Sequence, residues 1–179
     1  MKSRFLVIAS LAALTGCSES KIAPVNPAGQ MSFVYAGALT GSFSADGAMP
    51  VTTTDQRTMP WAAGQRDASA VFVDAAMPRS ATTYDIVFLQ INRTTPGSES
   101  IDIGAADVVI LLGALVSGTG QPLQTCALDA GTVAITAITS VRATGTFSGT
   151  GTCLPSAGGS AAFTVTNGAF DVALLADVP

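Results

Sequence analysis

The last predicted element of the chain alternates apolar and small polar residues so regularly that it restricts the fold to β structure. Residues 163–166 (FTVT) precede the dipeptide Asn167-Gly168, and residues 169–174 (AFDVAL) follow it. A period of two is that of a half-buried strand, and Asn-Gly favours a type I′ turn in which both residues take positive φ. We therefore predict a hairpin with one wholly apolar face, formed by Phe163, Val165, Phe170 and Val172.

Similar patterns elsewhere predict about ten short strands in all. The clearest are Met31–Leu39, Gly41–Ala45, Ala70–Val73, Tyr84–Ile91 and Val108–Leu112. The last two are apolar at nearly every position, which indicates central strands buried on both faces. Residues 49–67 show no clear period and are predicted as a loop, and residues 92–100 and 118–122 as turn-rich connections. The expected fold is all-β, an antiparallel β-sandwich, with a small β-barrel as the alternative.

Composition supports strands over helices. Hydrophobic residues make up 48% of the chain and charged residues only 11%, so its polar faces must be built largely from Thr and Ser. Surface helices usually display Glu and Lys, whereas Thr suits a half-buried strand.

The N-terminus has the features of an export signal. Lys2 and Arg4 form a positive region, and the apolar run over residues 5–14 is shorter than the roughly 20 residues that a membrane-spanning helix needs. The motif that follows, Leu14-Thr15-Gly16-Cys17, resembles the lipobox of bacterial lipoproteins, in which the cysteine sulfur is lipidated and the cysteine becomes the first residue after cleavage. The alternative is an ordinary secretory signal that a cysteine happens to follow.

The resemblance implies a helical signal peptide over residues 1–16, a lipidated cysteine with a flexible tether over residues 17–30, and a single β-domain over residues 31–179. Several acyl chains on Cys17 would hold the protein stably to the membrane. By the enterobacterial sorting rule, Ser18 in place of Asp favours the outer membrane. The stretches YAGALTGSFSADG, GTFSGTGTC and FTVTNGAFDVAL are also similar to small Gly/Thr-rich β-domain lipoproteins, which supports the fold and supplies no activity.

Cys126 and Cys153 remain as an even pair in an oxidising compartment, where disulfides persist. If residues 131–137 and 142–148 form a hairpin that turns near Thr139-Ser140, a register in which paired residue numbers sum to about 279 places the two cysteines opposite each other. We therefore predict a disulfide. A pair of metal ligands is the rival interpretation, but the chain has no histidine and no third cysteine free to join them.

The sequence offers few groups for catalysis, and we predict no enzyme activity and no cofactor or metal. Without histidine, Ser-His-Asp and Cys-His sites are excluded, and Lys21, the only lysine after the signal, lies in the tether. Paired carboxylates could act on a glycoside, and Asp102 with Asp107 could bind calcium, but solvated aspartates at turns and strand ends are the favoured interpretation. The aspartates considered are Asp85, Asp102, Asp107, Asp129 and Asp171. Residues 145–151 (GTFSGTG) lack the lysine and the helix of a phosphate loop and are predicted as a strand.

Charge and aromatic residues narrow the choice of partner. Removal of Lys2 and Arg4 would leave six basic residues against 12 acidic ones, a net charge of about −6, so a nucleic-acid partner is not expected. One aromatic and cationic cluster could form a binding surface, although its tryptophan could equally plug an open end of the sandwich. It consists of Trp61, Arg57, Arg66 and Arg79.

Three hypotheses follow for the function. The favoured one is a non-enzymatic envelope protein, anchored in the membrane through lipid, that holds or recognises another protein. A small-ligand or glycan-binding domain is the alternative, and it would need a concave patch with Trp61, Tyr35 or Tyr84 beside aspartates. A hydrolase would need two facing carboxylates about 5–10 Å apart.

Overall fold

The computed structural model describes residues 27–37, 39–101, 106–115, 117 and 122–175. These form ten strands and one short helix: β1 (Ala28–Gly37), β2 (Gly41–Ala48), α1 (Thr53–Thr58), β3 (Trp61–Arg66), β4 (Val71–Pro78), β5 (Thr83–Ile91), β6 (Gly97–Ser100), β7 (Ala106–Leu115), β8 (Gln124–Ile138), β9 (Arg142–Pro155) and β10 (Ala161–Ala173). The predicted signal peptide and Cys17 lie outside the described residues.

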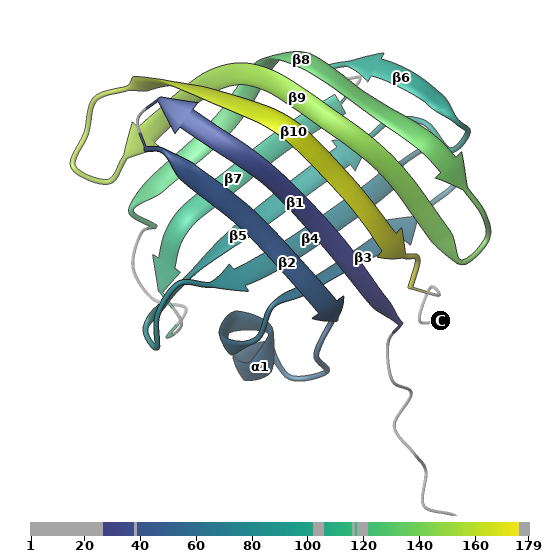
Figure 1. Ribbon diagram of the computed structural model, residues 1–179, viewed down its shortest axis with the longest axis horizontal. Helices are drawn as coiled ribbons and strands as arrows, with labels where there is room; N and C mark the ends of the chain where they lie inside the picture. The colour runs from purple at the N-terminus through teal and green to yellow at the C-terminus, as the bar shows by residue number, and fades with distance from the viewer. Residues whose placement is uncertain (1–26, 38, 102–105, 116, 118–121, 176–179) are drawn as a thin grey trace, which may run out of the picture.

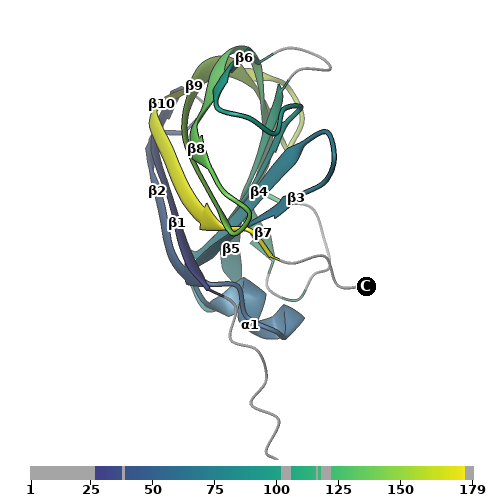
Figure 2. The ribbon, with the colours of Figure 1, turned by 90° about the vertical axis from the view of Figure 1, so that its right-hand side faces the viewer.

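All ten strands belong to one antiparallel sheet in the order β2-β1-β10-β9-β8-β7-β5-β4-β3. β6 pairs with residues 132–135 of β8, beyond the part of β8 that pairs with β7. The sheet curls until its two halves face each other, with β2, β1, β10, β9 and β8 crossing over β7, β5, β4 and β3 (Figures 1 and 2). A parallel bridge between Gly64 and Leu174 joins β3 to the end of β10, and Leu175 N–H donates to the Gly64 carbonyl at 2.8 Å. The all-β antiparallel fold is thus confirmed, as one sheet nearly closed into a barrel whose halves enclose a sandwich-like core.

The interior of the barrel is filled with apolar side chains from alternate positions of both halves. Phe33 stacks on Phe43 with ring centroids 4.9 Å apart, and Phe147 meets Phe33 edge-on at 5.6 Å. These three rings are at most 3% exposed. The centre of the barrel is therefore a packed core.

The two most apolar strands, β5 and β7, are confirmed, but β5 is not buried on both faces. Val87, Leu89 and Ile91 point inward and are at most 1% exposed, whereas Phe88 points outward and is 41% exposed. The reason is topological: the sheet has a single core, and the one helix among the described residues, α1, does not cover the outer side of Phe88 as helices would in an α/β protein.

The predicted hairpin at Asn167-Gly168 is wrong. β10 runs without a turn from Ala161 to Ala173, and its register against β9 shifts between Val165 and Gly168, which marks a β-bulge. Asn167 takes φ 53° as expected, but Gly168 does not have a positive φ. The dipeptide forms a bulge because β1 and β9 pair with β10 on both sides of it.

The same bulge explains why the four predicted apolar residues do share one face. One extra residue reverses the alternation, so odd-numbered positions point inward before the bulge and even-numbered positions after it. Each of the four is at most 3% exposed: Phe163, Val165, Phe170 and Val172.

Three connections contain more structure than their sequences indicated. Residues 49–67, predicted as a loop, hold α1 and β3, and residues 92–100 hold β6. The Thr52 hydroxyl caps α1 by accepting from Asp55 N–H at 3.1 Å. A threonine is a common N-cap residue, but residues 49–67 have no apolar period that would have pointed to a helix. β1 begins at Ala28, so part of the predicted tether is a strand.

Candidate functional site

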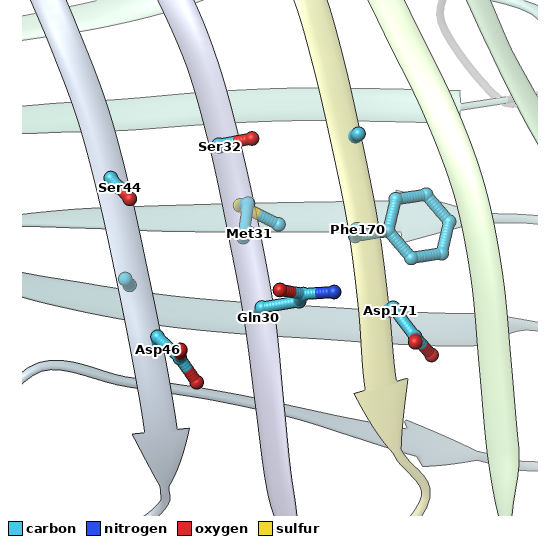
Figure 3. Close-up of a pocket in the computed structure, with 9 residues that line it drawn as sticks. Gln30, Met31, Ser32, Ser44, Asp46, Phe170 and Asp171 are labelled. Carbon is cyan, nitrogen blue, oxygen red and sulfur yellow. The ribbon is translucent and has the colours of Figure 1, made fainter.

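A polar hollow of about 240 Å³ lies on the outer face of β2, β1 and β10 (Figure 3). Gln30 occupies its centre, because the register of β1 pairs this residue with Asp46 on β2 and with Asp171 on β10. Ser32 and Ser44, one pair further along, continue the polar row. Met31, Ala45 and Phe170 alternate with these residues, point into the core and close the floor of the hollow.

The two carboxylates of this hollow have different electrostatic surroundings. Asp171 accepts from Arg142 Nε at 2.5 Å, and this hydrogen bond raises the pKa of the Arg142 guanidinium above its usual value. Asp46 is exposed, and among the described residues it takes part in none of the ion pairs. The hollow can therefore accept hydrogen bonds from a small polar group through Asp46, Gln30 and the serines.

Sequence reasoning included Asp171 among its candidate carboxylates but missed the other polar residues of this hollow. Asp46 directly follows the predicted strand Gly41–Ala45 and is not among the candidate aspartates, and Gln30 falls in the predicted tether of residues 17–30. The available signal was the alternation itself, which places Gln30 and Ser32 on the outer side of β1.

A second hollow, of about 310 Å³, lies on the outer face of β4, β5 and β7. Its side chains are mainly apolar: Phe72, Phe88 and Val109 are half-buried or exposed. Asp74 and Asp107 are its carboxylates. Burial raises the pKa of the Asp74 carboxyl above its usual value.

Trp61 is a structural plug and not a binding surface. It is 5% exposed, its Nε1 donates to the Gln56 carbonyl of α1 at 2.7 Å, and it packs with Ala63 and Ala76. Arg79, predicted to lie beside it, is engaged elsewhere. The predicted aromatic and cationic cluster is therefore not assembled around an accessible tryptophan.

Arg79 instead closes one end of the barrel together with Asp85. Its Nε donates to an Asp85 carboxylate oxygen at 2.5 Å, and its terminal nitrogen donates to the Tyr35 hydroxyl at 2.8 Å and to the Ser42 carbonyl at 3.0 Å. Asp85 is 2% exposed, which makes it a buried structural carboxylate and not the solvated one that was expected. Burial raises the pKa of Tyr35, and the nearby Arg79 guanidinium offsets part of that rise.

The remaining candidate carboxylates do not converge on a cleft. Asp129 is exposed and accepts from the Thr152 hydroxyl at 2.9 Å. Asp107 is exposed at the start of β7, and Asp102 lies outside the described residues. Within the described part of the chain, no three Cys, Asp or Glu residues are grouped as metal ligands would be. Residues 145–151 lie in β9, as predicted for a strand.

Cys126 and Cys153 form the predicted disulfide, with Cα atoms 3.9 Å apart. The hairpin turns at residues 139–141, where Thr139 N–H donates to the Arg142 carbonyl at 2.8 Å. The predicted register holds only around the cysteines: paired residue numbers sum to 281 at Ile138 and Ala143 beside the turn, and two bulges in the β8–β9 pair reduce this sum by one each.

No helix of the described residues is both long enough and apolar enough to cross a membrane. Comparison of the chain with protein-family models, curated proteins and solved structures finds no match.

Proposed function

We propose that this chain is a lipid-anchored protein of the bacterial cell envelope whose β-domain binds another envelope protein and catalyses no reaction. The anchor is inferred from the resemblance of residues 14–17 to a lipobox, and the disulfide of the β-domain is consistent with an oxidising compartment. Ser18 favours the outer membrane.

The packed interior is the observation that carries this proposal. Barrels that transport small ligands hold them inside the strands, and here that space is occupied by the rings of Phe33, Phe43 and Phe147. Recognition must then use the outer surface. One outer face has a polar hollow and the other a largely apolar one, so each offers a different surface to another protein.

Photo-crosslinking in the native envelope tests this proposal. A p-benzoylphenylalanine residue at position 32 reports on the polar outer face, and one at position 88 reports on the apolar outer face. We expect a protein adduct at one of these positions, and release of the protein from the membrane fraction in Cys17→Ser. Absence of protein adducts at both positions, or Cys17→Ser protein that stays in the membrane, would contradict the proposal.

Glycan binding at the polar hollow is the second candidate, because Gln30, Ser32, Ser44 and Asp46 present hydrogen-bonding groups side by side. The aromatic side chains named for sugar stacking do not line this hollow: Trp61 and Tyr35 are at most 6% exposed, and Tyr84 is half-buried against the Trp61 cluster. A glycan array that gives no signal with wild type, or the same signal with Asp46→Asn and Gln30→Ala, would exclude this candidate.

A further inference from the structure

The outer face of β4, β5 and β7 is apolar around one central carboxylate. We call it the Asp74 face and define it by the outward side chains that line its hollow: Phe72, Asp74, Phe88, Gln90, Asp107 and Val109. Val73, Val87 and Val108 alternate with them and point into the core. The other side of the barrel presents mainly serine, threonine and glutamine at its outward positions, where Val34 of β1 and Leu154 of β9 are exposed apolar exceptions.

Asp74 has apolar neighbours on all four sides. The register places Ala63 of β3 and Phe88 of β5 opposite it, and Phe72 and Ala76 flank it on β4. None of the ion pairs formed by the described residues includes Asp74 or Asp107. The Asp74 carboxylate is therefore partly desolvated and has no ion-pair partner in the described part of the chain, which agrees with its raised pKa.

This arrangement restricts what can cover the face. Burying Phe88, which is 41% exposed, would be favourable. A purely apolar cover would also bury the Asp74 charge unpaired, which is costly. The occupant must therefore bring a cation or a strong hydrogen-bond donor into the middle of an apolar contact.

Two occupants fit this requirement poorly. A second copy bound through the same face would place Asp74 and Asp107 of one molecule near those of the other. A bilayer with anionic headgroups would be repelled by the same carboxylates. A protein segment with a basic residue avoids both problems.

We propose that the Asp74 face docks a segment of another protein in which a lysine or arginine side chain lies between apolar side chains. The cation pairs with Asp74, and the flanking apolar groups pack on Phe72, Phe88 and Val109. Asp107 lies at the exposed rim, where it favours the approach of a basic partner. This inference rests on the proposed function, because it names the surface and the partner chemistry of an interaction module.

Peptide binding to the full-length purified chain tests the chemistry. The probes are three peptides, acetyl-Gly-Leu-X-Leu-Gly-amide, with X as lysine, norleucine or glutamate, and affinities are measured by NMR titration. We expect the lysine peptide to bind at least about tenfold more tightly than the norleucine peptide, as for a hydrogen bond to a charged group. Asp74→Asn should reduce this preference to about twofold or less, and the matched control Asp46→Asn, on the other outer face, should retain it.

Two results of this titration would overturn the inference. One is a titration in which the lysine and norleucine peptides bind equally tightly, or in which none of the three peptides binds at millimolar concentration. The other is a lysine preference that survives in Asp74→Asn.

Native-envelope crosslinking separates this inference from the proposed function. The inference is supported by an adduct at position 88 that is lost in Asp74→Asn. The crosslinked partner peptide should contain a basic residue between apolar ones. Adducts at position 32 alone overturn the docking surface and leave the interaction module standing. Self-association in sedimentation, or binding to phosphatidylglycerol vesicles, would overturn the inference if Phe88→Ser abolishes it.

Discussion

The buried carboxylate of Asp85 accepts a hydrogen bond from the backbone N–H of Gly113 at 2.9 Å and so ties β5 to β7 where their register shifts. Its other oxygen accepts from Arg79. The Asp85 side chain thus accepts from a backbone N–H at the register shift and also holds the arginine that closes this end of the barrel.

Asp85→Ala should destabilise the protein markedly. The change leaves the Gly113 N–H without its acceptor and Arg79 without its counter-ion, and the expected loss is near the lower end of roughly 3–5 kcal/mol because Arg79 is partly solvated. Urea unfolding of wild type and Asp85→Ala measures this loss. Asp129→Asn is the exposed control, and its free energy of unfolding should lie within about 0.5 kcal/mol of wild type. Equal midpoints for Asp85→Ala and wild type would show that the Asp85 network does not support the fold.

Removal of the disulfide should lower stability without changing the register. Cys126→Ser with Cys153→Ser frees a loop whose closure contributes on the order of 3.5 kcal/mol in the chain-entropy model. Thermal unfolding of oxidised and reduced wild type and of the double variant measures this contribution. Wild type should give no thiol signal at these two cysteines before reduction, and a full signal there would contradict the bridge.

The bulge in β10 should tolerate little change at Gly168. A Cβ there would lie 2.3 Å from the Phe147 carbonyl oxygen, so Gly168→Val should lower the melting temperature through a steric clash and not through a positive φ. Asn167→Gly should be tolerated, since glycine adopts the observed φ of 53° freely.

Truncation of Phe170 tests the inward face that the bulge creates. Phe170→Ala removes a ring that is 3% exposed and should cost roughly 3–5 kcal/mol. Ala169→Ser, one residue away on the outer side, is the matched control. An unchanged melting temperature for Phe170→Ala would mean that this face of β10 is not part of the core.

Two aspartates should give pH dependences of opposite sign. Burial raises the pKa of Asp74, so its contribution to stability is most favourable below the ordinary carboxyl pKa of about 3.9 and falls as pH rises through its native pKa. Hydrogen bonds from the Ser69 and Ala70 N–H groups lower the pKa of Asp67, so its contribution is present above that ordinary value and lost as pH falls through its native pKa.

Denaturant unfolding across this pH range measures both contributions. Asp74→Asn should be more stable than wild type at neutral pH and should lose that advantage in acid. Asp67→Asn should be less stable than wild type at neutral pH. If Asp67→Asn were more stable than wild type at neutral pH, or Asp74→Asn less stable, the direction assigned to that aspartate's pKa shift would be wrong.

Local alternation was enough to predict most strands, because period two reports directly on which side of a sheet is buried. It located Tyr84–Ile91 and gave the right facing of Phe163 and Phe170. The prediction failed at Asn167-Gly168 because the same dipeptide occurs in turns and in bulges. Which of the two forms depends on pairing with the distant strands β1 and β9.

The candidate surfaces were less accessible to sequence reasoning for the same physical reason. Gln30 meets Asp46 and Asp171 only through pairings between strands distant in the chain, and Asp74 acquires its apolar surroundings from Ala63 and Phe88. The disulfide was predictable because both cysteines lie on one hairpin at similar distances from its turn, although two bulges that the sequence did not reveal set the exact pairing.

The strand order has a consequence for how the molecule is made. β1 lies between β2 and β10, so the first of the described strands to be synthesised has both edges paired only after the last of them is made. Without β10, β1 can pair only with β2, and a lone two-stranded hairpin is marginally stable in water, so closure must bring together segments from opposite ends of the domain. A translation product that stops before Ala161 would leave Phe33 and Met31 uncovered, and proteases that remove unfolded chains would recognise it.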